Sequence, residues 1–261
     1  MAELNGKPVT LDELQSLALT NYGHFTSMRM EDGTVRGLSL HLDRLVRDCR
    51  LVFGVELDRE QTQSYIRKAA EGTTGVAGLR VTVFDPAIDM GRPSDAKDPH
   101  VLVNLRPAGA LTPPPLTAKS FDFTRDSAAV KHIGLHSQLR VRREAQLAGF
   151  DDAFFVEPDG CVSEGGTWNL GFVDQEGAVI WPAAPVLPGT TMLLLQSLDA
   201  PKQITMPVRL TDVPSMAAAF ATNTTIGVRS VTSLDEVQFP EDHPVLDALR
   251  EGYVAIPGDS L

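Results

Sequence analysis

The stretch VKHIGLHSQLRVRREAQLAGFDDAFFVEPDGCVSEGGTWNLGFV, residues 130–173, decides how this chain folds. Its apolar residues recur at helical spacing over 135–148, and Gly149 ends that pattern. Short apolar runs then alternate with glycine-containing turns, which predicts the strands of a meander. Within this meander, Glu164 has apolar neighbours and precedes two glycines. Because carboxylates are rarely buried alone, the sequence predicts a specific partner for Glu164 and a close approach to the backbone after it.

The composition limits the class of protein. The chain has 261 residues, enough for one large domain or two smaller ones. Its 34 acidic and 23 basic residues give a net charge of −11, which argues against nucleic acid or an anionic membrane as a partner. The sequence shows neither a membrane-helix pattern nor a signal-peptide pattern. The two cysteines, Cys49 and Cys161, are far apart, which favours a reducing, cytoplasmic setting.

The clearest boundary in the sequence is ALTPPPLTA, residues 110–118, because three consecutive prolines continue neither a helix nor a central strand. Strand-like and helix-like segments are mixed both before and after it. The expected fold class is therefore α+β, with two domains. A small α/β domain covers residues 1–109, an inter-domain connector follows, and a larger domain with a curved antiparallel sheet covers 119–261.

Three local signals in the first domain are specific enough to check. Thr10 and Glu13 form a capping-box pattern at the start of a helix. The Asp-Gly pair at 32–33 marks a turn between two strands. A further helix is expected to begin after Ser39 as its N-cap and to stop at Gly54.

Two threonine-containing turns are candidate anion-binding sites. Gly189, Thr190 and Thr191 open a helix, whose free N–H groups and hydroxyls suit a phosphate. Thr224 and Thr225 lie in a turn after an apolar strand. Ordinary capping and turn formation explain each pattern as well when it is taken alone.

Arg44 and Lys131 are the cations that stand out. Arg44, in HLDRL, offers a fork of donors to a phosphate, although a solvated helix face or a pair with Asp43 or Asp48 explains it too. Lys131 follows an apolar run. A desolvated lysine acts as a nucleophile or forms a Schiff base, whereas the ordinary alternative is a lysine at an exposed strand end.

Other catalytic patterns are weak. His132 and His136 are four residues apart, but without a third ligand in the pattern they predict no metal site. The sequence contains no dinucleotide fingerprint, P-loop lysine or nucleophile elbow.

Taken together, the candidates suit one ligand that offers an aldehyde to a lysine, a phosphate to two anion sites and a ring nitrogen to a carboxylate. Pyridoxal phosphate has all three groups. The order of the candidates resembles the class IV, or fold-type IV, aminotransferases, which include branched-chain and D-amino acid aminotransferases, (R)-amine transaminases and 4-amino-4-deoxychorismate lyase. The resemblance extends from NYGHFTSMRM to TNTTIGVRSV and is most specific over residues 130–173. The candidates, in order, are Arg44, Lys131, Glu164, Thr190, Thr191 and Thr224.

The resemblance implies a role for each residue. Lys131 would carry the Schiff base and move the proton at the substrate α-carbon, and Glu164 would keep the ring nitrogen protonated. Leu187 would pack on the ring, while Gly165 and Gly166 would let the backbone approach the cofactor. The implied phosphate ligands are Arg44, Gly189, Thr190, Thr191, Thr224 and Thr225. The family fold, a small domain plus a pseudo-barrel domain, implies an active site at the domain interface that the partner of a homodimer completes.

The specificity signals in the chain conflict. Phe25 stands where D-amino acid enzymes have a substrate-contacting tyrosine, and His136 replaces a ring-hydroxyl tyrosine of branched-chain enzymes. Ser27 occupies the position of a functional threonine of the lyase, whereas Arg80 resembles a carboxylate-binding arginine of branched-chain enzymes. Arg229, in GVRS, either enters the pocket or points outward.

Three functions follow from the resemblance. The first is a PLP-dependent aminotransferase that moves an amino group from an amino acid or amine to a 2-keto acid. The second is a 4-amino-4-deoxychorismate lyase, which releases pyruvate and needs no keto-acid acceptor. The third is a non-catalytic relative that binds pyridoxal phosphate or lacks it, and the retention of Lys131, Glu164 and both threonine turns argues against it. The expected cofactor is pyridoxal 5'-phosphate, and the expected assembly is a homodimer.

Overall fold

The computed structural model describes residues 2–261, which fold into two compact units. The first unit is the chain up to Ala108 together with Val130–Gly134 and Pro257–Leu261. The second unit is Gly109–Ala129 together with Leu135–Ile256. The sequence assigned all of residues 119–261 to the second domain, so two short segments differ from that expectation.

Backbone pairing explains why these two segments belong to the first unit. The main-chain N–H of Phe25 donates to the carbonyl of Lys131 at 2.8 Å, and the N–H of Ile133 donates to the carbonyl of Gly23 at 3.0 Å. The C-terminal strand β16 (Asp259–Ser260) pairs with β4 (Thr34–Val35). Such pairing satisfies main-chain groups that would otherwise need water, and short sequence patterns do not reveal it.

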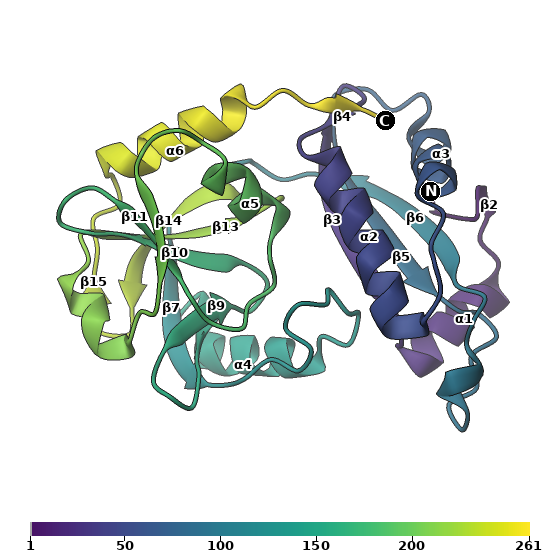
Figure 1. The fold of residues 1–261 in the computed structure, drawn as a ribbon, viewed down its shortest axis with the longest axis horizontal. Helices are drawn as coiled ribbons and strands as arrows, with labels where there is room; N and C mark the ends of the chain where they lie inside the picture. The colour runs from purple at the N-terminus through teal and green to yellow at the C-terminus, as the bar shows by residue number, and fades with distance from the viewer. Residues whose placement is uncertain (1) are drawn as a thin grey trace. The chain divides into compact units, whose positions relative to one another are not determined.

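The first unit is built on a seven-stranded sheet in which every pairing is antiparallel, in the order β16-β4-β3-β5-β6-β1-β2. Two helices, α2 and α3, pack against one face of this sheet, and α2 crosses it in Figure 1. The remaining elements are β1 (Ala2–Leu4), β2 (Lys7–Pro8), α1 (Leu11–Thr20), β3 (His24–Glu31), α2 (Leu38–Phe53), α3 (Arg59–Ala70), β5 (Val76–Phe84), the 3-10 turn Pro93–Asp95 and β6 (His100–Pro107).

The sheet sorts its side chains by alternation along β3 and β5. Met28 and Met30 on β3 face the helices, in one core with Leu42 and Leu45 of α2. Phe25 and Ser27 point to the opposite face, since neighbouring residues of a strand alternate between faces. Phe25 and Ser27 therefore lie on the face of the sheet that does not carry these helices.

Most local expectations for the first unit are confirmed. Thr10 and Glu13 form both hydrogen bonds of the capping box, and the turn at 32–33 has two positive φ angles of 47° and 79°. α2 ends at Gly54, as predicted. Its start was predicted wrongly: Gly37, with a φ of 66°, is the N-cap, and Ser39 lies within the helix. Glycine adopts this left-handed conformation without strain, and this outweighs the capping preference of serine.

The second unit contains a nine-stranded sheet that closes on itself. Its order is β12-β11-β10-β13-β14-β7-β8-β9, and the ninth strand, β15, pairs with β14 outside this path. Because β9 also pairs with β10, the strands from β10 to β9 form a barrel. The elements are β7 (Leu116–Asp122), α4 (His136–Leu147), β8 (Asp152–Val156), β9 (Val162–Gly165), β10 (Asn169–Val173), β11 (Val179–Pro182), α5 (Thr190–Gln196), β12 (Gln203–Met206), the 3-10 helix Leu210–Ser215, β13 (Ala218–Asn223), β14 (Gly227–Leu234), β15 (Val237–Gln238) and α6 (Pro244–Ala255).

The α+β fold class is confirmed, but the expected wholly antiparallel sheet is wrong. The pairs β7–β8, β7–β14 and β11–β12 are parallel. α4 lies between β7 and β8 in the chain, and α5 lies between β11 and β12. A helix in the connection returns the chain to the same end of the sheet, which makes the paired strands parallel. Among residues 2–261, no helix is both long and apolar enough to cross a membrane.

Candidate active site

In the first unit, Lys131 is held by its main chain. Its N–H donates to Oδ2 of Asp48 at 3.0 Å, and its carbonyl accepts the N–H of Phe25 at 2.8 Å. The side-chain amine lies 4.9 Å from the centre of the Phe25 ring. Both main-chain groups of the lysine are thus used, so the stem of its side chain starts from a fixed position.

Two of the residues expected to bind substrate lie beside Lys131 in this unit. The Arg80 guanidinium stacks on the buried Phe25 ring, with 3.7 Å between its Cζ and the ring centre. Ser27 is half-buried and is paired with Arg80 across β3 and β5. Burial, followed by repulsion from Arg106, lowers the pKa of Arg80. Phe25 therefore brings an amine and a guanidinium to one ring.

Arg44 is buried on the sheet-facing side of α2. The two carboxylates that the sequence offered as its partners, Asp43 and Asp48, accept hydrogen bonds from other arginines. Asp43 accepts from Arg59 at 3.1 Å, and Asp48 accepts from Arg47 at 2.7 Å. Arg44 Nη2 donates to the hydroxyl of Thr26 instead. Burial lowers the pKa of Arg44 to about 10, which leaves it charged at neutral pH, and the Asp48 carboxylate opposes this shift. Its Nε is buried and has no hydrogen-bond partner within the described chain.

His41 completes this buried cluster and is neutral. Its Nδ1 lies 2.7 Å from the Thr26 hydroxyl and 3.3 Å from Nη2 of Arg44. Because Arg44 only donates, Nδ1 is the acceptor, and the proton of the neutral ring sits on Nε2. Burial, followed by the charges of Arg44 and Lys131, holds the pKa of His41 well below its usual range. His41 therefore orients Arg44 without adding charge.

In the second unit, Glu164 lies at the pairing that closes the barrel. It is the last but one residue of β9 and pairs with Asn169 of β10. Its side chain is 5% exposed. Oε1 accepts from Nη1 of Arg125 at 3.0 Å, and Oε2 accepts the main-chain N–H of Leu187 at 3.2 Å. Both donors favour the ionised carboxylate. Arg125 is thus a partner of Glu164 within the protein, while the ring nitrogen that the resemblance implies as its partner stays a prediction.

The two glycines after Glu164 are small for reasons within the protein. A Cβ at Gly165 would lie 2.0 Å from Cε2 of Trp168, because the indole packs on the glycine backbone. A Cβ at Gly166 would lie 3.1 Å from Asp152 and 3.2 Å from Arg142. Close contacts within the protein thus require both glycines to be small, and the approach to a cofactor stays a prediction.

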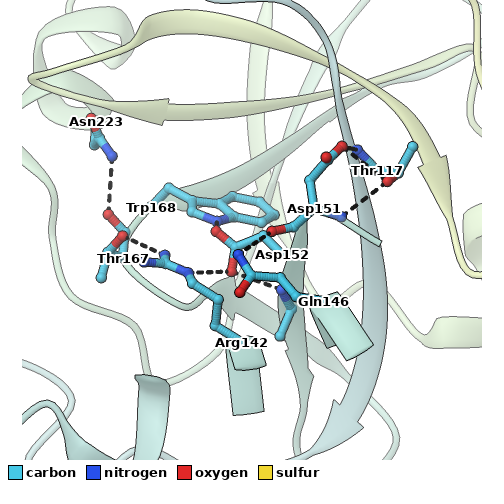
Figure 2. Close-up of polar contacts among 9 residues, drawn as sticks. Thr117, Arg142, Gln146, Asp151, Asp152, Thr167, Trp168 and Asn223 are labelled. Atoms are coloured by element: carbon cyan, nitrogen blue, oxygen red, sulfur yellow. Dashed lines mark hydrogen bonds and ion pairs between the residues drawn. The ribbon is translucent and has the colours of Figure 1, made fainter. Parts of the chain in front are cut away.

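Figure 2 shows how this turn is tied to the rest of the barrel. Asp152 accepts from Nε of Arg142 at 2.8 Å and from the indole N–H of Trp168 at 2.9 Å. Arg142 also donates to the Thr167 hydroxyl at 2.7 Å. Asn223, at the end of β13, donates to the Thr167 carbonyl at 3.1 Å. The turn after Glu164 and the second threonine turn therefore share one hydrogen-bond network.

The first threonine turn contains a buried hydroxyl, that of Thr191, without a hydrogen-bond partner among the described residues. Gly189 is the N-cap of α5, and a Cβ there would lie 2.0 Å from Oδ1 of Asn169. Asn169 also donates to the carbonyl of Leu187 at 2.8 Å, which fixes the chain just before the turn. Thr190 and Thr191 are buried. The Thr191 hydroxyl has no hydrogen-bond partner anywhere in residues 2–261, which is costly unless a ligand supplies one.

The second threonine turn is organised by Asn223. Its side-chain oxygen accepts the N–H groups of Thr225 at 2.8 Å and Ile226 at 3.1 Å. Thr225 is exposed and its N–H is already used, so it fits the turn-forming alternative better than a phosphate ligand. Thr224 is half-buried. The buried Thr222 hydroxyl, which the sequence did not single out, has no hydrogen-bond partner in the part of the chain that is described.

Two remaining candidates have clear positions. His136 is exposed and is the first residue of α4. His132 lies before that helix, so the two histidines do not share a helical face. Arg229 donates to the carbonyls of Pro114 at 2.6 Å and Pro115 at 3.2 Å. Its role is to hold the proline-rich segment, which answers the question that the sequence left open.

Sequence reasoning missed Arg125, Asp48 and His41. Asp48 and His41 carried a signal, because positions 41, 44 and 48 recur at helical spacing on the side of α2 that also carries Leu45. Polar residues on an apolar helix face indicate buried partners. Arg125 lies in an irregular segment 39 positions from Glu164, and no local pattern marks it.

A family model described as amino-transferase class IV matches residues 23–234. The chain belongs to the class IV aminotransferase family. The matched range contains every candidate discussed above, and the family resemblance predicted from the sequence is confirmed, as is the assignment to a family of enzymes.

Relatives of this class IV aminotransferase span nearly its whole length. A probable branched-chain-amino-acid aminotransferase of Rickettsia bellii is 25% identical over 277 residues, 96% of this chain and 93% of the relative. A solved hypothetical aminotransferase from Mycobacterium tuberculosis, in PLP-bound form, has a TM-score of 0.83 at 20% identity and 98% coverage of each chain. A putative 4-amino-4-deoxychorismate lyase from Legionella pneumophila has a TM-score of 0.79 at 22% identity, covering 89% of this chain and 90% of its own. The structural likeness confirms the fold.

Proposed function

We propose that this chain is a pyridoxal phosphate-dependent aminotransferase that moves an amino group from an amino acid or amine to a 2-keto acid. The observation that carries the proposal is Lys131. Its main chain is fixed on both sides, and its amine lies beside the buried Phe25 ring. In a member of this family, such an amine is the group that the reaction needs at the substrate α-carbon.

The residues fit pyridoxal phosphate. A phosphate needs donors that the protein has not used, and within residues 2–261 Arg44 Nε and Thr191 Oγ1 are buried without a hydrogen-bond partner. The pyridine nitrogen needs a carboxylate, and Glu164 is buried with two donors that keep it ionised. Taken separately, the first unit offers Arg44 as a phosphate ligand, and the second unit offers Thr191 and Thr224 for a phosphate and Glu164 for the ring nitrogen, as the family resemblance implies. The cofactor, when bound, supplies an electron sink for negative charge at the substrate α-carbon.

The protein residues then have separate tasks. The Lys131 amine must be uncharged to take the proton from the substrate α-carbon, and the ammonium group so formed then returns a proton. Arg80, held against Phe25, orients the substrate by its carboxylate. Leu187, buried and fixed by the Asn169 amide, presents an apolar side chain to the ring.

The visible absorption spectrum of the purified protein tests this proposal. After addition of pyridoxal phosphate, we expect a band that an amino donor from a panel of L-amino acids, D-amino acids or (R)-amines removes and that a 2-keto acid restores. Lys131→Ala should abolish turnover, whereas Lys119→Ala, a change at a lysine of β7, should not. Normal turnover by Lys131→Ala contradicts the proposal, and the absence of any band favours a non-catalytic relative.

Ser27 supports a second candidate, an aminodeoxychorismate lyase. It lies on the sheet face that carries Phe25, whose N–H bonds the Lys131 carbonyl, and it is paired with Arg80 across β3 and β5. A lyase releases pyruvate from aminodeoxychorismate without a keto acid, and Ser27→Ala should reduce that release more than it reduces transamination. Ser39→Ala, at an exposed residue of α2, is the control. Pyruvate release without an acceptor would favour the lyase over the aminotransferase.

We further propose a homodimer in a reducing, cytoplasmic compartment. The dimer follows from the family resemblance, and the compartment from Cys49 and Cys161, which are both buried free thiols. Sedimentation equilibrium of the full chain tests the dimer, because a molar mass near 28.2 kDa at micromolar concentration would contradict it.

A further inference from the structure

Asp48 is a buried carboxylate that the reaction itself does not use. It lies on α2, is fully buried, and divides its two oxygens between two partners. Oδ1 accepts from Arg47 at 2.7 Å, and Oδ2 accepts the main-chain N–H of Lys131 at 3.0 Å. Burying a charged carboxylate is costly unless hydrogen-bond donors satisfy its oxygens. A helix ion pair at the surface avoids this cost, so the burial of Asp48 calls for an explanation.

The surroundings of Asp48 are strongly positive. Arg44 and Arg47 lie on the same helix, and the Asp48 charge raises the pKa of Arg44 against the effect of burial. Lys131 adds a further positive charge, which contributes to lowering the pKa of His41 on that helix. Asp48 is thus the carboxylate set among three cations, one of which is the lysine that it anchors.

We propose that Asp48 is a positioning residue for Lys131: its carboxylate fixes the lysine main chain and offsets the positive charge gathered around it. The inference rests on the proposed function only in assigning Lys131 to the reaction. The 83 positions between the two residues mean that the contact joins α2 to a segment far along the chain. The Asp48 contact therefore adds to the main-chain hydrogen bonds that join the lysine segment to Gly23 and Phe25.

Two substitutions separate the anchor from the charge. Asp48→Asn keeps an oxygen that can accept the Lys131 N–H, and its amide group then faces Arg47, whose side chain is 40% exposed and can move. Asp48→Ala removes both acceptor and charge. Asp43→Asn is the matched control, because Asp43 is on the same helix, is 63% exposed and pairs with Arg59.

The first measurement is hydrogen exchange of the Lys131 amide in the full-length protein, freed of bound aldehyde with hydroxylamine. Asp48→Ala should speed exchange by at least about tenfold, since a hydrogen bond to a charged acceptor is lost. Asp48→Asn should largely restore protection, and Asp43→Asn should leave exchange unchanged. Wild-type protection in Asp48→Ala would overturn the anchoring part of the proposal.

The second measurement is trace acetylation of the Lys131 amine across pH, followed by mass spectrometry. The carboxylate bonds the main chain of the same residue, so at a charge separation of roughly 9 Å and an effective dielectric constant of about 20–40 its loss should lower the midpoint of the acetylation profile by about one pH unit. An unchanged midpoint in Asp48→Asn would overturn the charge part, and Asp48→Asn decides the matter even if Asp48→Ala does not fold. Neither measurement needs pyridoxal phosphate. A wild-type protein that binds no cofactor would therefore contradict the proposed function while leaving the Asp48 result intact.

Discussion

Removing Arg125 should destabilise the second unit strongly. Its side chain is 8% exposed, and that of Glu164 is 5% exposed. Arg125→Met removes the guanidinium that the buried Glu164 carboxylate accepts from, and it also removes a donor to the carbonyl of Ala128 at 3.1 Å. Breaking a buried pair in this way costs about 3–5 kcal/mol in the free energy of unfolding. At roughly 2–4 °C per kcal/mol for a domain of this size, Tm should fall by roughly 6–20 °C.

Urea denaturation followed by tryptophan fluorescence measures this effect. The only two tryptophans of the sequence, Trp168 and Trp181, are buried in the second unit, so their emission reports its unfolding. Arg140→Met is the control, because Arg140 forms an exposed pair with Glu144 on α4 and its loss should cost at most about 1 kcal/mol.

A double-mutant cycle decides whether the effect is due to the pair itself. Glu164→Gln keeps the shape of the side chain and removes its charge. The double variant of Arg125→Met and Glu164→Gln should therefore be more stable than the sum of the single effects by about 2 kcal/mol or more. The reasoning is refuted if Arg125→Met costs no more than Arg140→Met, or if the two changes are additive.

Three further results are expected. Gly165→Ala should lower the free energy of unfolding by about 3 kcal/mol or more, measured by tryptophan fluorescence, because the new Cβ would lie 2.0 Å from Trp168. The control is Gly109→Ala, where a Cβ meets no atom within 4 Å and the loss should be less than about 0.5 kcal/mol. Burial lowers the pKa of His24 to about 3, so below pH 6.5 the unfolded chain binds a proton that the folded chain does not. The free energy of unfolding should therefore fall by at most about 1.4 kcal/mol per pH unit as the pH drops from 6.5 towards 3. His24→Leu should flatten this loss in an acid denaturation profile, and an unchanged profile would contradict the reasoning. Thr191→Val removes a buried hydroxyl that lacks a partner in residues 2–261, so the cofactor-free protein should stay as stable as before. Pyridoxal phosphate should bind about tenfold more weakly in a fluorescence titration. Equal affinity would contradict the assignment of Thr191 to the phosphate.

The local structure of this protein could be predicted from sequence because its causes are local. The capping box of Thr10 and Glu13 and the stop of α2 at Gly54 depend on hydrogen bonds within a few residues. The order of Lys131, Glu164 and the threonine turns can likewise be read from the sequence. This order resembles class IV aminotransferases, which was sufficient to predict the family and its α+β fold.

The tertiary structure decided which groups meet. The parallel strand pairs, the assignment of residues 130–134 to the first unit and the partner of Glu164 all depend on contacts between distant positions. Arg125 lies in an irregular segment, and Gly165 is required by an indole three residues later whose direction depends on how the barrel closes. A sequence pattern shows that a buried carboxylate must be neutralised, because desolvation acts on any charge, but only the folded chain determines which donor reaches it.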